Sequence, residues 1–497
     1  MTTRDGPRAP ASGRRFFVET WGCQMNELDS QRMAGQLMAQ GMLPAGEAAA
    51  ADLILLNSCS VREKAVHKVY SRLGEYRRLK QERPDLRIGL CGCVAQQEGE
   101  RALARVADLD FVLGPARVGE LAELLPRLAG GERVVATGFP EDRVYELDDV
   151  ARFGEFKGMV TAIEGCDQRC TFCIVPSTRG PERCRPMAQI VAEVEHLLAL
   201  GFVEIELLGQ TVNHWREPGG EADFADLLDA VAPLEGLRRL RFVTSYPRDF
   251  TVRMVERFAR HENICDYFHL PVQSGSDAVL RRMGRGYTVA SYLDLVDTVR
   301  RARHSIALST DLIVGFPGER EEDFERTLEL LEQVRFSALF AFCFSPRPGT
   351  AATRLDGQVP GPVAEERLQR LLAAQARIQA EINESLVGRE LDVLVTGTGK
   401  GPDSLVGRTG CNRIVHLDLG TDGGGSGRKS QPVVRGRIVR AQVTRAMPHS
   451  LRGRLVAPPD FEANEPRRVG LAGSASSRAS RSDRNRSTGQ RLFPIVE

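Results

Sequence analysis

The feature that most constrains the fold of this chain is a repeated alternation of short β-branched or apolar runs with amphipathic helical segments. In the first part of the chain, strand-like runs at residues 15–21, 53–57 and 87–91 alternate with helical patterns at residues 27–40, 61–81 and 97–106. Such alternation is typical of βαβ units, in which helices cover a parallel sheet. Residues 15–130 are therefore predicted to form an α/β domain with a parallel sheet.

A second and longer series follows a linker at residues 131–151. Its strand-like runs are at residues 159–164, 203–208, 240–245, 267–272, 307–314 and 338–345. The intervening segments, such as 187–200 and 321–334, carry helical periodicity. Six βα repeats are too few for a closed eight-stranded barrel, so residues 152–386 are predicted to form an open, partial (β/α)6 barrel.

The end of the chain has a different pattern. Short β-rich runs at residues 391–396, 413–417 and 438–443 are separated by turn residues, including those at 420–429. This pattern predicts a small β-barrel at residues 387–455. Residues 1–14 and 456–497 have little periodicity and are expected to be disordered.

Bulk properties exclude some classes of protein and leave others open. The 67 Lys and Arg residues nearly balance the 66 Asp and Glu residues, so the net charge of +1 identifies no partner. The amino terminus has no apolar signal region, and no run approaches 18 apolar residues, so we expect no membrane segment and a soluble cytoplasmic protein. In that compartment the 11 cysteines are expected to act as metal ligands or reactive thiols.

The strongest chemical motif is Cys166-x3-Cys170-x2-Cys173, directly after a predicted strand. Three thiolates on one loop can bind three irons of a [4Fe–4S] cluster, which leaves the fourth iron open. The amino and carboxylate groups of S-adenosylmethionine can bind that open iron. The alternative is a zinc knuckle, but zinc requires four ligands, and the nearest histidine, His196, lies on a predicted helix well away.

A second set of cysteines occupies equivalent places in the first domain. Cys23, Cys59 and Cys93 each follow one of its predicted strands. The carboxyl ends of parallel strands meet at one edge of a sheet, so these thiols are expected to converge and hold a second cluster. Alternatively, they are ordinary buried cysteines. Cys91 is a competing ligand, but it falls inside the predicted strand, so Cys93 is favoured.

The remaining cysteines carry weaker signals. Cys265, Cys343 and Cys411 stand alone in apolar or β contexts and are interpreted as packing residues. The role of Cys184 stays open.

With these motifs the chain resembles the methylthiotransferase family of radical S-adenosylmethionine enzymes, from residue 16 to about residue 454. The resemblance implies a flavodoxin-like domain that holds an auxiliary cluster, a radical S-adenosylmethionine barrel, and a small RNA-binding β-barrel called TRAM. The runs GCQMN at 22–26 and CSVREKA at 59–65 resemble the branch that acts on dimethylallyladenosine in tRNA. The branches for a ribosomal-protein aspartate and for threonylcarbamoyladenosine typically read GCPKN and GCKVN at the first site.

Further motifs of the family occur at residues 208–213 (LGQTVN), 269–276 (HLPVQSGS) and 311–319 (DLIVGFPGE). By resemblance they line the S-adenosylmethionine pocket, and the residues carried over are Gln210, Asn213, Gln273, Ser274, Asp311 and Gly315. There are two departures, because Cys184 replaces a usual serine and Thr211 a common asparagine. Neither change affects a proposed cluster ligand.

The resemblance also implies the reaction. The cluster on Cys166, Cys170 and Cys173 would cleave S-adenosylmethionine to a 5′-deoxyadenosyl radical, which removes hydrogen from adenine C2. The auxiliary cluster would supply sulfur, and a second S-adenosylmethionine the methyl group. No side chain is assigned as a catalytic acid or base.

The implied partners are tRNA carrying dimethylallyladenosine next to its anticodon, and a reducing donor such as flavodoxin or ferredoxin; the protein is expected to be a monomer. Basic residues of the last domain that could bind phosphate are Arg389, Lys400, Arg408, Arg413, Arg435 and Arg437. Rival hypotheses are an enzyme of the same chemistry that modifies a ribosomal protein, and a non-catalytic iron–sulfur RNA sensor.

Overall fold

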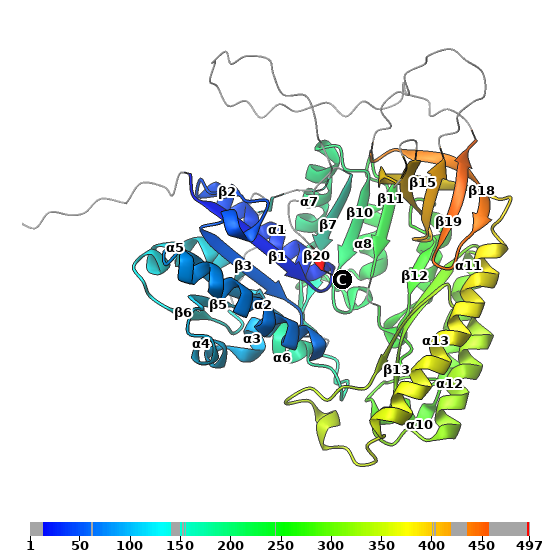
Figure 1. Cartoon of the computed structure of the whole chain (residues 1–497). Coiled ribbons are helices and arrows are strands. Elements are labelled where there is room, and N and C mark those ends of the chain that lie inside the picture. The colour runs from blue at the N-terminus through cyan, green and yellow to red at the C-terminus, as the bar shows by residue number, and fades with distance from the viewer. Residues whose placement is uncertain are drawn as a thin grey trace, which may run out of the picture.

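The structure is a computed structural model that describes residues 13–60, 63–140, 150–151, 154, 156–243, 245–399, 401, 404–418, 435–456 and 495–496. Three bodies lie side by side in Figure 1: an N-terminal sheet domain in blue and cyan, a central barrel in green and yellow, and a small barrel in orange. No helix in the described part of the chain is long and apolar enough to cross a membrane.

The N-terminal domain is a parallel sheet with strand order β2-β1-β3-β4-β5-β6. This is the flavodoxin-like order, as predicted. The strands are β1 (Arg15–Trp21), β2 (Leu43–Pro44), β3 (Leu53–Ser58), β4 (Arg87–Gly92), β5 (Phe111–Leu113) and β6 (Val134–Ala136). Their side chains enter two apolar clusters, one on each face of the sheet.

Helices cover both faces of this sheet. They are α1 (Gln24–Ala39), α2 (Glu63–Glu82), α3 (Cys93–Glu98), α4 (Glu100–Arg105) and α5 (Leu121–Ala129), with the 3-10 turns η1 (Ala48–Ala50) and η2 (Pro115–Glu120). α1 begins three residues before the predicted start at residue 27, and the last predicted helix is divided. The helix expected at 97–106 begins at Cys93 and is interrupted at Gly99, whose positive φ of 51° breaks it into α3 and α4.

The central domain has the six predicted barrel strands, all parallel. They are β7 (Lys157–Thr161), β10 (Glu204–Leu208), β11 (Arg239–Phe242), β12 (Tyr267–His269), β13 (Ala307–Val314) and β14 (Ala338–Cys343). A single bridge between Leu240 and Ile264 joins the two halves of the sheet. The run expected as one strand at 159–164 is divided, because β8 (Ile163–Glu164) leaves β7 to pair with β9 (Arg183–Cys184).

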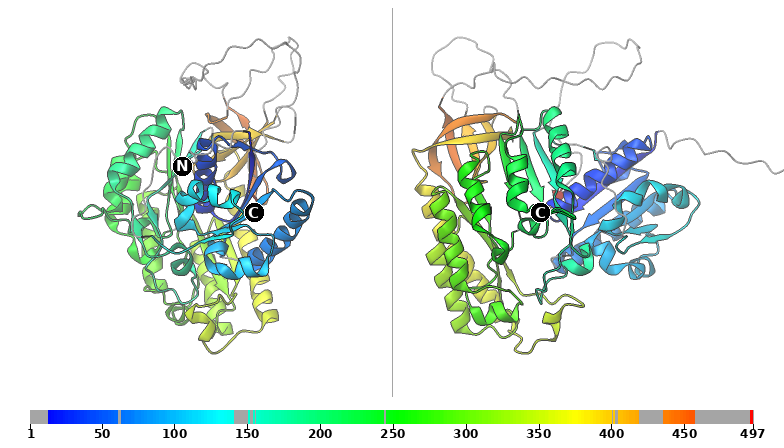
Figure 2. Two further views of the ribbon diagram at one scale, coloured as in Figure 1. Left: turned by 90° about the vertical axis from the view of Figure 1, so that its left-hand side faces the viewer. Right: turned by 180° about the vertical axis from the view of Figure 1, so that it is seen from behind.

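Helices pack on the outer face of this barrel, as Figures 1 and 2 show. They are α7 (Met187–Ala199), α8 (Phe224–Val231), α9 (Val252–Arg260), α10 (Asp277–Arg282), α11 (Val289–Ala302), α12 (Glu321–Val334) and α13 (Gly361–Glu384). Shorter elements are α6 (Val175–Arg179), η3 (Val212–His214), η4 (Pro247–Asp249) and η5 (Ala351–Arg354). Alternate strand residues such as Phe268, Leu308 and Leu312 are buried in the main apolar core.

The last domain is a closed five-stranded barrel in the order β15-β16-β17-β19-β18. Its strands are β15 (Glu390–Thr398), β16 (Ser404–Thr409), β17 (Ile414–Asp418), β18 (Ile438–Ala446) and β19 (Ser450–Leu455). The sequence did not indicate β16 or β19, because glycines replace apolar residues at inward positions. A Cβ at Gly407 would lie 2.5 Å from the backbone oxygen of Leu394, so only glycine fits there.

Two parts of the last segment need separate mention. The predicted turn at 420–429, Lys400, and most of the predicted disordered tail lie outside the described residues. At the end of that tail, β20 (Ile495–Val496) pairs in parallel with Thr20 and Trp21 of β1. This short strand was not expected from the sequence.

Two buried arginines join the small barrel to the central domain. The guanidinium of Arg239 donates to the backbone oxygens of Arg408 and Asp392, at 2.8 and 2.9 Å. Arg241 donates to those of Gly410 and Thr409 at the same two distances. The small barrel is therefore anchored on β11 of the central domain.

Two candidate cysteine centres

The first cysteine centre is built by the loop that follows β8. Gly165 has a φ of 75°, and a Cβ there would lie 2.0 Å from the backbone oxygen of Pro181, so the loop enters through a glycine. The backbone N–H of Cys166 then donates to Gly180 at 3.1 Å. A cavity of about 700 Å³ opens over the loop and is lined by Cys166, Cys170 and Cys173 together with neighbouring polar residues.

The electrostatic surroundings of this loop are mixed. Burial raises the pKa of Cys166 to about 11 and that of Cys173 to about 12. The charge of Arg285 opposes the rise in the pKa of Cys173. Its guanidinium also donates to Sγ of Cys170 at 3.3 Å. Arg285 is itself held over the ring of Tyr246, 4.1 Å from its centre. A cationic donor of this kind stabilises thiolates that bind iron.

The residues expected to bind S-adenosylmethionine lie at different depths. Oε1 of Gln210 is buried and has no hydrogen-bond partner among the described residues, which leaves an acceptor for a ligand. The Asn213 amide is satisfied within the protein, because it exchanges hydrogen bonds with the backbone of Tyr246 at 2.9 and 2.8 Å. Asp311 is about one-third exposed and lies 3.5 Å from Nε2 of His269.

The other three expected residues are held mainly by backbone contacts. Gln273 has a φ of 73°, unusual for a residue with a side chain, and bridges to β13. Ser274 is fully buried, and its hydroxyl accepts from the N–H of Ser276 at 3.2 Å. Gly315 has a φ of 69°, and a Cβ there would lie 2.5 Å from Cβ of Ala364 on α13. A direct contact of these residues with the cofactor stays a prediction.

The second centre collects three cysteines from three βα junctions. Cys23 precedes α1, Cys59 follows β3, and Cys93 is the first residue of α3. Cys23 is exposed, whereas Cys59 and Cys93 are buried. A hydrogen bond with Cys59 lowers the pKa of Cys23 to about 6, with a further contribution from Arg179. Burial raises the pKa of Cys93, and the same Arg179 opposes that rise.

Cys91 has different surroundings. It lies inside β4, is completely buried in an apolar cluster, and has a pKa that burial raises far above its usual range. Its thiol therefore belongs to the apolar cluster that also contains Phe111.

The surroundings of the second centre suit an iron–sulfur group. Gly22 has a φ of 137°, and a Cβ there would lie 2.6 Å from Cβ of Cys59, so the chain comes close to that thiol. Two buried donors close in sequence to these cysteines have no partner within the described residues: Nε1 of Trp21, two residues before Cys23, and Oγ of Ser60, directly after Cys59. Unpaired donors of this kind can bind sulfide or thiolate sulfur.

Within the described part of the chain, no three Cys, His, Asp or Glu side chains are grouped closely enough to hold a single ion. The thiolates of a four-iron cluster each bind a different iron, so three cysteines of such a site need not meet at one point.

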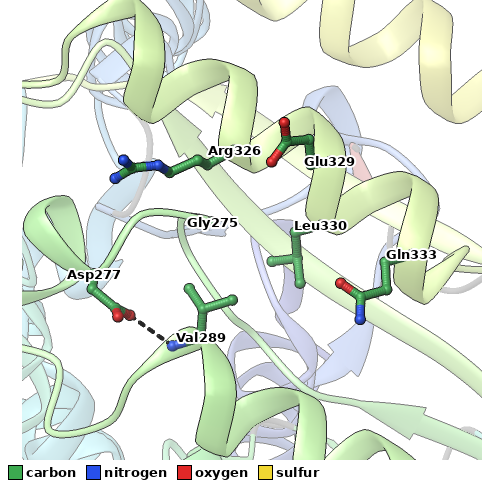
Figure 3. A pocket seen from close by; sticks show the side chains of 7 residues that line it. All are labelled: Gly275, Asp277, Val289, Arg326, Glu329, Leu330 and Gln333. Carbon is green, nitrogen blue, oxygen red and sulfur yellow. Dashed lines mark hydrogen bonds between the residues drawn. The ribbon is translucent and has the colours of Figure 1, made fainter.

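A second hollow, of about 370 Å³, lies on the outer side of the barrel between α12 and the start of α11 (Figure 3). Arg326, Glu329, Leu330 and Gln333 line it from α12, and Asp277 accepts a hydrogen bond from the N–H of Val289 at 2.7 Å. It contains no cysteine and is separate from both centres.

Sequence reasoning missed two residues of these centres, Arg179 and Arg285. Arg285 follows the expected motif 269–276 by nine positions, and Arg179 follows Cys173 by six. Arg179 begins the run RGPERCRP at 179–186, which was considered only for its Cys184. Nothing in the local sequence distinguishes Arg285 from the many other arginines of the chain. Cys184, which was left open, lies in β9, and its sulfur accepts from the N–H of Arg216 at 3.4 Å.

Three family models match the chain. An uncharacterized protein family, UPF0004, matches residues 15–114, the radical SAM superfamily matches residues 160–331, and the TRAM domain matches residues 384–456. The three matches follow the three bodies of the structure in order.

Whole-length relatives are also found. The chain is 48% identical to the tRNA-2-methylthio-N(6)-dimethylallyladenosine synthase of Anaeromyxobacter dehalogenans, over 90% of this chain and 96% of the relative. It is 44% identical to the enzyme of the same name from Symbiobacterium thermophilum, over 90% of this chain and 98% of the relative. Among solved structures, the radical S-adenosylmethionine methyltransferase TsrM from Kitasatospora setae is similar in fold, with a TM-score of 0.51 at 14% identity, over 74% of this chain and 89% of that one.

Proposed function

Because this chain belongs to the family of tRNA-2-methylthio-N(6)-dimethylallyladenosine synthases, we propose that it adds a methylthio group to C2 of the dimethylallyladenosine next to the anticodon of tRNA. It is a radical S-adenosylmethionine methylthiotransferase. Within the structure, the observation that carries the proposal is the cavity lined by Cys166, Cys170 and Cys173 at the start of the central barrel.

We assign a [4Fe–4S] cluster and S-adenosylmethionine to that cavity. When bound, the cluster supplies the electron that cleaves the sulfonium. The protein contributes position and charge: Cys166, Cys170 and Cys173 are the ligands, and Arg285 donates to the sulfur of Cys170. The free acceptor of Gln210 is available to the cofactor, and the amide of Asn213 holds the backbone at Tyr246.

A second [4Fe–4S] cluster is proposed at Cys23, Cys59 and Cys93, where it would supply the sulfur. Support comes from the lowered pKa of Cys23 and from the unpaired donors of Trp21 and Ser60. Cys91 is excluded as a ligand in this proposal because its side chain is buried in the core.

The tRNA is proposed to bind across the small barrel and the mouth of the central one. Arg389 and Arg408 are exposed on the small barrel, whereas Arg413 is engaged with Asn383 and Cys411. Arg435 and Arg437 are half-buried at the start of β18. We further propose a flavodoxin or ferredoxin as the electron donor, and a monomeric enzyme in the cytoplasm.

The test uses anaerobically reconstituted protein, a reductant, S-adenosylmethionine and tRNA that carries dimethylallyladenosine. Nucleoside mass spectrometry should detect the 2-methylthio product together with 5′-deoxyadenosine. The matched control is tRNA with unmodified adenosine, and the variant Cys166→Ala/Cys170→Ala/Cys173→Ala should form neither product. Absence of both products with active wild-type protein would refute the proposal.

The same assay decides against the rival hypotheses. A non-catalytic sensor would bind tRNA without releasing 5′-deoxyadenosine. An enzyme for a ribosomal protein would release it only when that protein is added.

A further inference from the structure

Arg179, the last residue of α6, reaches from the central domain into the cysteine centre of the N-terminal domain. Its side chain is 4% exposed, and its Nη1 lies 2.8 Å from Oδ2 of Asp29. Its Nη2 donates to Oδ1 of Asn26 at 3.2 Å. Asn26 is also the residue whose side chain meets Sγ of Cys23, at 3.4 Å. Figure 1 shows α6 beside α3, the helix that begins with Cys93.

The guanidinium of Arg179 acts on the cysteines as well as on its partners in α1. Its Nη1 forms an ion pair with Asp29 but no well-aligned hydrogen bond within the described residues. A side-chain hydrogen bond and the charge of Arg179 oppose the rise in the pKa of Cys93 that burial causes. The same charge contributes to the lowered pKa of Cys23, so Arg179 influences two of the three proposed ligands.

A second arginine bridges the same interface without this property. Arg32 lies 3.2 Å from Oε1 of Glu164 and 3.7 Å from Oδ1 of Asp29, and it donates to Oγ1 of Thr161 at 3.1 Å. It therefore links α1 to the central domain, as Arg179 does. Arg179 is among the largest influences on the pKa of Cys23 and Cys93, whereas Arg32 is not among those largest influences. A comparison of substitutions at Arg32 and Arg179 can therefore separate the effect of domain docking from the effect of a positive charge near the cysteines.

The charge of Arg179 matters because reduction of a cluster adds a negative charge. A buried cation next to the site stabilises the reduced form more than the oxidised form, and low dielectric surroundings strengthen the effect. The carboxylate of Asp29 neutralises Arg179 only in part, since it is shared with Arg32.

We propose that Arg179 is a positioning residue of the auxiliary cluster, contributed by the central domain, whose charge and hydrogen bonds stabilise the reduced form of that cluster. The inference rests on the proposed function, in which Cys23, Cys59 and Cys93 hold the second cluster. It makes the auxiliary centre a product of two domains.

The experiment isolates the auxiliary cluster in the full-length variant Cys166→Ala/Cys170→Ala/Cys173→Ala. Arg179→Gln, Arg179→Lys and Arg32→Gln are each added to this background and reconstituted anaerobically. Iron content is measured, and a redox titration followed by electron paramagnetic resonance gives the reduction potential. Arg32→Gln is the matched control for a loosened interface.

Arg179→Gln should disfavour reduction at least tenfold, a shift of about 59 mV to more negative potential for one electron. Arg179→Lys, which keeps the charge, and Arg32→Gln should each change the reduction equilibrium by no more than about threefold relative to the background, about half of the shift in potential given above. Equal potentials in the background and in Arg179→Gln would overturn the inference, and so would an equal shift in Arg32→Gln.

Two further outcomes are also decisive. If Arg179→Gln holds no cluster, Arg179→Lys should retain iron, and equal loss in both variants would overturn the role of the charge. If the background itself holds no iron while Arg179 is intact, the second cluster of the proposed function is wrong, and the inference falls with it. If the background holds about four irons but its reduction potential does not change in Arg179→Gln, the inference is refuted while the proposed second cluster stands.

Discussion

At the residue scale, the three cysteines of the auxiliary centre are chemically unequal although they follow equivalent strands. Cys23 is exposed and shares a hydrogen bond with Cys59, while Cys93 is buried at the start of α3. Reactivity follows the thiolate fraction, so the three should behave differently in metal-free protein.

Cys23 should be the first of these thiols to be alkylated. With a pKa of about 6 it is mostly thiolate at neutral pH, so its rate with iodoacetamide should rise through about pH 6 and level off above about pH 7. The alkylation rate of Cys173, which has a pKa of about 12, should still be rising at the highest pH used. Mass spectrometry of alkylated peptides from metal-free protein gives both profiles, and parallel profiles would contradict the expectation.

The choice between Cys91 and Cys93 can be tested by substitution. Cys93→Ala should lose the auxiliary cluster, about half of the iron of the protein. Cys91→Ala should keep it, because Cys91 only packs in the core, at a stability cost of about 1 kcal/mol. Iron analysis of both variants decides, and the reverse pattern would show that Cys91 is the ligand.

His214 supplies a pH-dependent contact near the first centre. Its Nδ1 lies 2.6 Å from Oε1 of Glu182, and this hydrogen bond raises the pKa of His214. A raised histidine pKa means stabilisation that is complete below the unfolded-state pKa and is lost as pH rises through the folded-state value. The thermal midpoint of the wild type should therefore exceed that of His214→Gln at about pH 5.5, and the gap should narrow by about pH 8.5. A constant gap would show that the contact does not titrate.

At the scale of elements, the junction between β4 and α3 shows how a turn presents a ligand. Gly92 has a φ of 86° and a ψ of −157°, which side chains rarely adopt, and Cys93 follows it directly. A Cβ at Gly92 would lie 2.3 Å from Oδ1 of Asn57 and 2.6 Å from the backbone oxygen of Ser58. The turn thus sets Cys93 beside the end of β3, where Cys59 follows.

Gly92→Ala should consequently destabilise the domain and release the auxiliary cluster. The backbone strain alone costs about 1–3 kcal/mol, and the clash with Asn57 adds to it. Gly99→Ala is the matched control, since Gly99 also has a positive φ but nothing within 4 Å of the new Cβ. Urea unfolding should show a larger loss of stability in Gly92→Ala than in Gly99→Ala. Iron analysis should show a loss of cluster in Gly92→Ala alone. Equal iron in the two variants would mean that the turn does not control the ligand.

At the scale of the whole molecule, the small barrel is fixed to the central barrel by buried charge. Arg241 is 6% exposed, lies 3.0 Å from Oε1 of Glu204, and donates to the backbone of Thr409 and Gly410. The RNA surface proposed on the small barrel therefore has a defined orientation relative to the cysteine cavity.

Arg241→Gln should loosen this attachment. Removing one member of a buried ion pair costs about 3–5 kcal/mol, so the barrel should detach more readily and tRNA binding should weaken. Cleavage of S-adenosylmethionine should persist, because the residues 166–173 are untouched. The exposed Arg238→Gln is the matched control in a tRNA-binding assay. If tRNA affinity is unchanged in Arg241→Gln, the orientation of the barrel does not matter for binding.

Much of this architecture is determined by the sequence itself. The strand of residues 15–21 and the helix of residues 321–334 were predicted to their last residue, because a buried parallel strand and an amphipathic helix each carry their own periodicity. The position of Cys23, Cys59 and Cys93 after three strands of one parallel sheet also followed from sequence, and the prediction that they meet rests on the topology that brings strand ends to one edge.

Only the tertiary structure decided which charged residues are buried and what they meet. Arg179, Arg241 and Arg285 look like surface residues in the sequence, because an isolated arginine is normally solvated. Arg179 and Arg241 are buried and Arg285 is half-buried, each against a segment distant in the chain: α1 for Arg179, the small barrel for Arg241, and the cysteine loop for Arg285. Local propensity contains no information about such contacts, since the desolvation of a charge depends on the partner that packs against it.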